Sequence, residues 1–388
     1  MASATTEPTW LEQRRRAGAS RADGMELPGA KAKGWEFTDL SGLDFDGFTQ
    51  AGASVEGLVE SGDDGVIVMP LAAAAEAHPA LVSERLGTLV PGDDIFTARN
   101  EARWRDGVFV YVPAGGRLAE PLRLTVAAAA GDAVDWRALV VLEEGAEAEV
   151  WERYASTGPG LFNGVLELVV GAGANLRYVC EQDISDDGWI FATQRAELGR
   201  DANLDWVALG FGSARGKVRM ETKLAGRGSS AKVTGAYAGT GSQHLDYDTT
   251  QEHAAPNTFS DLAFRGVLGG SSTAVWRGMI RVDKAAQHTD AFQESRNLLL
   301  SPKAHADAIP GLEIEADDVR CTHAAAVAQV DAEQLYYLRS HGLTEENAKR
   351  LVIDGFLQEL VERTVEGPIR KALAGALERR LSELLASA

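Results

Sequence analysis

The sequence predicts a mainly β protein, and a parallel β-helix is the favoured architecture for its middle part. Three features of the 388-residue chain lead to this prediction. Short runs with an apolar residue at every second position fill the middle of the chain, as expected of strands with one buried face. Phrases that combine a turn with a strand recur there at a nearly constant interval. Helix-like spacing of apolar residues is almost confined to the two ends.

We expect residues 1–95 to form an N-terminal region of mixed, partly helical structure. Residues 8–17 are compatible with a short helix, and residues 71–86 predict helical turns that end at Gly87. The Gly- and Asp-rich stretch between them, residues 38–64, is typical of loops and short strands.

The recurring phrases define the predicted β-helix core, residues 96–328. They begin at Gly145, Gly173, Asp201 and Gly228, with intervals of 28, 28 and 27 residues. A constant period of this kind is typical of a solenoid, in which each coil buries its inner face against the next. Two later phrases, at Gly270 and Ala286, are only 16 residues apart. On this pattern alone a β-sandwich remains the alternative, since its strands also recur every 8–12 residues or so.

Residues 329–388 should form a C-terminal helical domain. Leu335 and Leu338 lie three residues apart before Gly342, a natural helix stop, and Thr344 can cap the helix that follows. A last helix carries leucines on one side. Amphipathic helices of this kind pack on the remainder of the chain or on a partner, and the pattern does not decide between the two.

The charge balance excludes several classes of function. The chain has 38 Lys and Arg against 57 Asp and Glu, a net charge of −19, so we expect no nucleic-acid binding. No stretch reaches the roughly 18 apolar residues of a membrane helix, so we expect no membrane insertion. The N-terminus lacks the apolar core of a secretory signal. With only Cys180 and Cys321 present, the expected setting is the reducing cytoplasm.

Familiar catalytic motifs are missing from the sequence. The stretch GFGSARGKV, residues 210–218, resembles a phosphate loop but has Phe211 and Val218 where a glycine and a Ser or Thr are needed. Paired acids at Asp246 and Asp248, and again at residues 317–318, suggest as an alternative function a β-helix carbohydrate-active enzyme of the polysaccharide lyase kind. No set of basic residues accompanies these acids to hold an acidic sugar.

Cys321 and His323 form the most suggestive local pair. On a strand, residues two apart project from the same face, so the thiol and the imidazole would lie side by side. Together they could supply two soft ligands to iron or zinc. Two ligands do not complete a site, and a buried cysteine beside a hydrogen-bonded histidine remains the structural alternative.

The last third of the chain resembles the SufB/SufD family of iron–sulfur cluster assembly proteins, and its SufD branch in particular. The resemblance rests on residues 296–357, which begin RNLLLSPKAHADAIPGLEIEADDVRCTHAAAVAQVDAEQLYYLRSHGL. KGWEFTDL (residues 33–40) and DGVFVYVPAGGRLAEPLRL (residues 106–124) agree with it. The SufB branch carries a Glu after the histidine, where Ala324 stands here. The resemblance implies a right-handed parallel β-helix and a scaffold without catalytic activity of its own.

The same resemblance implies partners and candidate sites. The chain would pair with SufB through its β-helix, with a homodimer as the form of the isolated chain. His323, and more weakly Cys321, would face SufB where a transient iron–sulfur cluster forms, while the isolated chain holds no tightly bound cofactor. The ABC-type ATPase SufC would dock on the C-terminal helices, through a stripe that consists of Leu335, Leu338, Leu343, Leu351, Phe356 and Leu357.

Overall fold

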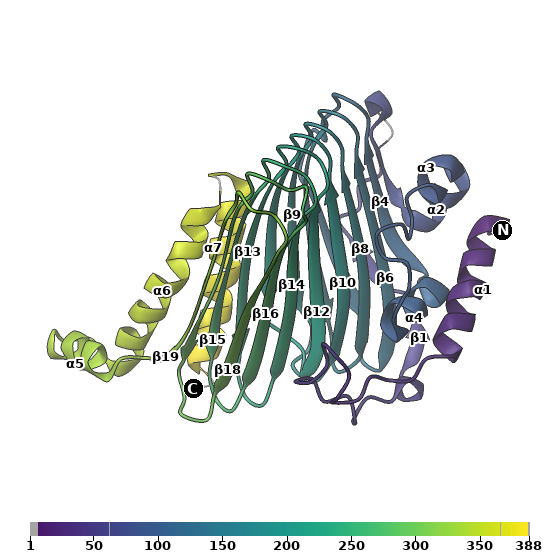
Figure 1. Cartoon of the computed structure of the whole chain (residues 1–388). Helices are drawn as coiled ribbons and strands as arrows, with labels where there is room; N and C mark the ends of the chain where they lie inside the picture. The colour runs from purple at the N-terminus through teal and green to yellow at the C-terminus, as the bar shows by residue number, and fades with distance from the viewer. Residues whose placement is uncertain (1–6, 62, 365, 387–388) are drawn as a thin grey trace.

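Two large sheets form the body of the chain, and successive strands alternate between them (Figure 1). The computed structural model describes residues 7–61, 63–364 and 366–386. Sheet A contains β1 (Thr49–Ala51), β3 (Ile67–Pro70), β4 (Asp106–Val112), β6 (Asp132–Leu142), β8 (Leu161–Val170), β10 (Trp189–Leu198), β12 (Arg215–Leu224), β14 (His244–His253), β16 (Thr273–Val282) and β18 (His305–Ile314). Sheet B contains β2 (Ser54–Glu56), β5 (Leu122–Ala128), β7 (Glu147–Ser156), β9 (Asn175–Asp183), β11 (Asn203–Gly210), β13 (Ser230–Gly239), β15 (Phe259–Leu268), β17 (Asp290–Leu299) and β19 (Arg320–Gln329).

From β4 onward every strand pairs in parallel with the strand two places along the chain. The result is a β-solenoid of about eight turns, which confirms the predicted β-helix. A β-sandwich is excluded because its strands pair in antiparallel fashion.

The 27–28 residue interval marks one coil of the solenoid. The four phrases that define it each open a strand of sheet B, and their turn residues have positive φ, from 57° at Asp201 to 75° at Gly228. The series continues at Asn257 and His288, with φ of 58° and 61°. Gly270 instead opens β16 of sheet A, which explains the short interval to the next phrase.

Apolar side chains from both sheets fill the interior of the solenoid. Trp136, Trp206 and Trp276 are all fully buried there. Glycines within strands make room for such large rings: a Cβ added at Gly278 would lie 2.2 Å from the indole of Trp276. The interior is therefore a packed core rather than a channel.

Antiparallel strands and helices close the N-terminal end of the solenoid. β3 pairs antiparallel with β4, and β2 with β5. The helices here are α1 (Thr9–Asp23), α2 (Leu71–Ala77), α3 (Pro79–Ser83) and α4 (Ile95–Arg103), with 3-10 turns η1 (Phe45–Gly47) and η2 (Asp63–Gly65). The predicted first helix thus runs further than residue 17, and the second divides at Pro79 as expected.

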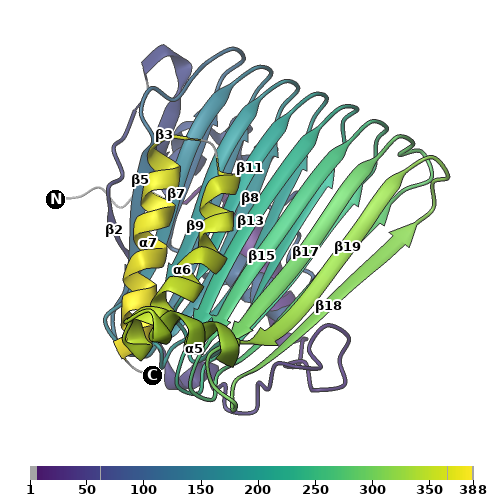
Figure 2. The same cartoon turned by 90° about the vertical axis from the view of Figure 1, so that its left-hand side faces the viewer.

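Three helices follow the last strand: α5 (Ala332–Ser340), α6 (Glu345–Arg363) and α7 (Pro368–Ala386). Figure 2 shows α6 and α7 lying along the outer face of sheet B. Their apolar sides share one cluster with that face, in which Leu360 and Leu373 from the helices meet Val179 and Val207 from the strands. The helices are therefore part of the same fold as the solenoid, whereas α5 projects from the body (Figure 1).

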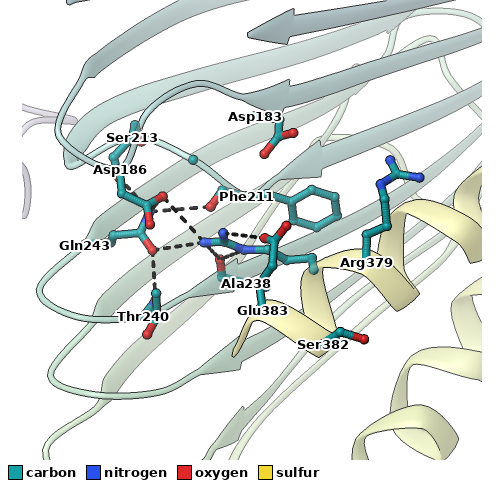
Figure 3. Close-up of polar contacts among 12 residues, drawn as sticks. Asp183, Asp186, Phe211, Ser213, Ala238, Thr240, Gln243, Arg379, Ser382 and Glu383 are labelled. Atoms are coloured by element: carbon teal, nitrogen blue, oxygen red, sulfur yellow. Dashed lines mark hydrogen bonds and ion pairs between the residues drawn. The ribbon is translucent and has the colours of Figure 1, made fainter. Parts of the chain in front are cut away.

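A buried arginine fastens α7 to the turns of the solenoid. Arg380 is 7% exposed, and it donates to the carbonyl oxygen of Ala238 (3.2 Å) and to Oε1 of Gln243 (3.2 Å). Asp186 and Glu383 compensate its charge at 3.7 and 3.2 Å (Figure 3). A buried charge with this many partners ties the helix to one position on the sheet.

Candidate functional site at the open end of the solenoid

The C-terminal end of the solenoid lacks the closing strands found at the N-terminal end. β18 is the last strand of sheet A and β19 the last strand of sheet B. Both therefore present an edge that has no partner strand in the described part of the chain. Leu312, Ile314 and Val327 are 37–43% exposed on this last coil. An uncovered strand edge with apolar side chains beside it is a ready template for another chain.

The structure places Cys321 and His323 on β19, at this open end. Their register partners on β17 are Ala291 and Gln293, both buried in the interior. Cys321 and His323 thus share the inward face of the strand, but no further coil covers them. His323 is exposed and Cys321 is half-buried. The pair lies at a surface rather than deep inside the solenoid.

The two side chains differ in what they offer a metal. Cys321 packs against a small apolar cluster, and this burial raises the pKa of its thiol, as does the nearby charge of Asp290. Burial therefore opposes the thiolate that a metal would need. The imidazole of His323 is open to solvent and can ligate in its neutral form. Among the described residues no group of three or more His, Cys, Asp or Glu is placed to hold a metal ion.

The residues predicted to dock an ATPase fall into three groups by their exposure. Leu335, Leu338, Leu343 and Phe356 are half-buried, while Leu351 is 53% exposed on the free side of α6. Leu357 is buried in the cluster between helix and sheet, so it serves the fold and offers no docking surface.

Sequence reasoning missed two aromatic residues on α5. Tyr336 and Tyr337 are 75% and 62% exposed, and α5 has no buried residue. The two tyrosines follow Leu335 directly but are not part of the predicted stripe of leucines. An adjacent aromatic pair inside a short helix was the available signal, since such residues are enriched where proteins bind one another.

An ion-pair network joins α6 to the strands next to the open end. Arg265 on β15 donates to Glu294 on β17 (2.7 Å) and to Glu359 on α6 (2.9 Å). Arg296 lies 3.2 Å from Glu294 and 3.8 Å from Glu359. The pKa of Glu359 is lowered, mainly by the hydrogen bond that it accepts from Arg265. Since Glu294 is in register with Ala324, this network lies one strand away from β19.

Of the two acid pairs that suggested a carbohydrate-active enzyme, residues 317–318 are exposed, with Asp318 2.9 Å from His288, whereas Asp246 and Asp248 do not form an open catalytic pair. Asp246 is 3% exposed and bound to Lys217 at 2.8 Å, and Asp248 lies 3.5 Å from Arg277. The loop that resembled a phosphate site is held instead by glutamines, with Gln182 and Gln243 bonded to its backbone. Neither the pair of Asp246 and Asp248 nor this loop offers groups free to bind a sugar or a phosphate.

The sequence that forms this two-sheet β-solenoid matches the family models of one class of iron–sulfur cluster assembly protein. The family model for the core domain of SufBD proteins of the SUF system matches residues 125–356. The model for the SufBD N-terminal region matches residues 46–124. The chain therefore belongs to the SufBD family of iron–sulfur cluster assembly proteins.

Curated relatives match over nearly the whole chain. The iron–sulfur cluster assembly protein SufD of Bacillus subtilis is 29% identical, over 97% of this chain and 95% of its own length. A SufBD family protein of Mycobacterium bovis is 31% identical over 92% of this chain and 90% of its own. The chain is thus a SufD homologue. None of the helices in the described part is long and apolar enough to cross a membrane.

Proposed function

We propose that this protein is the SufD-type scaffold subunit of a Suf complex, in which it pairs with SufB and docks SufC. The observation that carries the proposal is the open end of the solenoid, where both sheets stop at an unpaired edge. A second solenoid with the same two-sheet terminal coil can continue both sheets at once. Because the opposite end carries antiparallel strands and helices in place of a parallel terminal coil, such pairing gives a closed pair of chains and not a filament.

His323 is the residue that we assign to cluster formation at that junction. It is exposed at the open end and can donate one imidazole nitrogen to an iron of the nascent cluster, which is the cargo of the complex. The other ligands must come from the partner, as the described residues of this chain do not complete a metal site. Cys321 contributes less, because burial disfavours its thiolate.

The exposed side of α5 and α6 is the surface that we assign to SufC. Tyr336, Tyr337 and Leu351 are exposed there, with the half-buried leucines of α5 beneath them. Aromatic anchors of this kind carry much of the energy of protein interfaces. ATP binding and hydrolysis then belong to SufC, and this chain acts as a support without catalytic groups of its own. In the absence of SufB, a second copy of the chain occupies the open end and buries on the order of 1,000 Å² or more.

Anaerobic co-purification with SufB and SufC tests the proposal. Replacing Leu312 and Val327 together by lysine should abolish pairing with SufB, because two charges would be buried without partners. His323→Ala should leave the complex intact yet lower its iron and sulfide content, and Cys321→Ser should have a smaller effect. Full cluster loading by an intact complex that carries His323→Ala would refute the role of His323. Unchanged pairing of the lysine variant would refute the role of the open end.

A further inference from the structure

A segment near the N-terminus crosses the outer face of sheet A and is fixed there. It comprises residues 24–44, here called the N-terminal strap, and includes the motif KGWEFTDL. Trp35 is buried and stacks on Phe96 at a centroid distance of 5.1 Å. Thr38 donates to Asp246 (2.5 Å), whose other oxygen accepts from the buried Lys217 at 2.8 Å. These contacts hold the strap against β12 and β14.

One side chain of the strap points away from this buried contact. Phe37 is 41% exposed, and the guanidinium group of Arg277 on β16 lies 5.8 Å from its ring centroid. Arg277 is itself held by Glu36 of the strap, at 2.9 Å. The strap therefore reaches as far as β16, one strand from the edge of the sheet. Figure 2 shows it in purple at the lower right, beneath β18.

The edge strand adds a second exposed apolar side chain beside the first. Ile309 on β18 is the register partner of Arg277, and it is 37% exposed on the outer face of sheet A. Phe37 and Ile309 thus flank the same arginine. Single exposed apolar residues are common on protein surfaces. These two are different because Ile309 lies on the same edge strand as Leu312 and Ile314, whose exposed side chains are on the opposite face at the open end.

We propose that the N-terminal strap forms part of the partner interface, in which Phe37 and Ile309 contact an apolar side chain on the terminal strand of the partner solenoid. This inference rests on the proposed function. A strand added to β18 would lie about 4.8 Å beyond it, with alternate side chains on the outer face of the sheet. The side chain next to Ile309 would then face the same way as Phe37 and cover the patch.

Affinity measurements with purified SufB test the inference. The double variant Phe37→Ser/Ile309→Thr removes both apolar groups and keeps a β-branched residue on the strand. We expect it to bind SufB at least about tenfold more weakly. Phe37→Leu keeps an apolar group and should retain most of the affinity. Val59→Ser is the matched control, because Val59 is 73% exposed but lies near β2 at the closed end. Unchanged melting temperature and SufC binding show that each variant is folded.

The outcomes separate this inference from the function on which it rests. Loss of affinity in the double variant, with wild-type binding by Val59→Ser, supports the strap as part of the interface. Wild-type binding by the double variant, combined with loss of binding by the Leu312→Lys/Val327→Lys variant, overturns the inference and leaves the pairing at the open end intact. Wild-type binding by both double variants overturns the pairing itself, and the inference with it.

Discussion

A buried histidine should make the stability of this protein depend on pH. His253 is fully buried at the end of β14. Its Nδ1 lies 2.7 Å from the hydroxyl of Thr258 and its Nε2 lies 2.8 Å from that of Ser260. In a neutral imidazole one nitrogen donates and the other accepts, and each nitrogen of His253 faces a hydroxyl group that can take either role. The neutral ring therefore has a partner at both nitrogens.

Burial lowers the pKa of His253 from 6.5 to about 4. Below pH 6.5 the unfolded chain binds a proton at this site that the folded chain does not, so acid favours unfolding. The stability that comes from keeping the ring neutral is complete above pH 6.5 and is lost as the pH falls toward 4. A shift of this size corresponds to roughly 3 kcal/mol in total, of which about 2 kcal/mol falls between pH 7 and pH 5.

Denaturant unfolding of the wild type and of His253→Gln from pH 7.5 to 4.5 measures this contribution. Carboxylates titrate in both proteins, so the difference between the two curves isolates the histidine. The free energy of unfolding of the wild type should fall by about 2 kcal/mol more than that of the variant between pH 7 and pH 5. His341→Gln, at an exposed site, should follow the wild type. Parallel curves for wild type and His253→Gln would show that this imidazole is not held neutral by burial.

Three further outcomes follow from the packing. In the folded chain an aromatic disulfide reagent should modify Cys321 alone, because burial raises the pKa of Cys180 to about 12; equal reaction of both thiols would contradict this. Gly278→Ala should lower the free energy of unfolding by about 1–3 kcal/mol through overpacking. Gly29→Ala should leave it unchanged, because a Cβ added at Gly29 would meet no atom within 4 Å; equal stability of the two variants would count against the overpacking. Removing α5–α7 should give aggregated protein on gel filtration, because the apolar outer face of sheet B is uncovered; a monodisperse, cooperatively melting chain would refute that.

Much of the fold could be predicted because the solenoid repeats itself along the chain. Each coil needs a left-handed turn before its strand in sheet B, so turn residues such as Gly173 and Gly228 recur at one period. The coil that begins at Asn257 was not predicted from the period, because asparagine takes the left-handed turn there in place of glycine or aspartate.

The residues of the candidate site, Cys321 and His323, could be predicted from the sequence, but the strands that surround them could not. The spacing of Cys321 and His323 determines that they share a face of one strand, because side chains alternate along every strand. Only the tertiary structure decided that this face looks inward at an open end, because the face is set by the pairing of β19 with β17.

For the C-terminal helices and the N-terminal strap too, the sequence determines the local structure and the tertiary structure decides which residues are exposed. The leucine stripe of residues 335–357 determines that the C-terminal segment is helical and amphipathic. Which of its residues stay exposed was decided by sheet B, which buries Leu357 and leaves Leu351 and Tyr336 outside. Phe37 reaches β16, one strand from the edge of sheet A, because side chains more than 200 positions away, Asp246 and Arg277, hold the strap. Local spacing encodes secondary structure, but contacts between distant segments depend on how the coils stack, and only the folded chain brings them together.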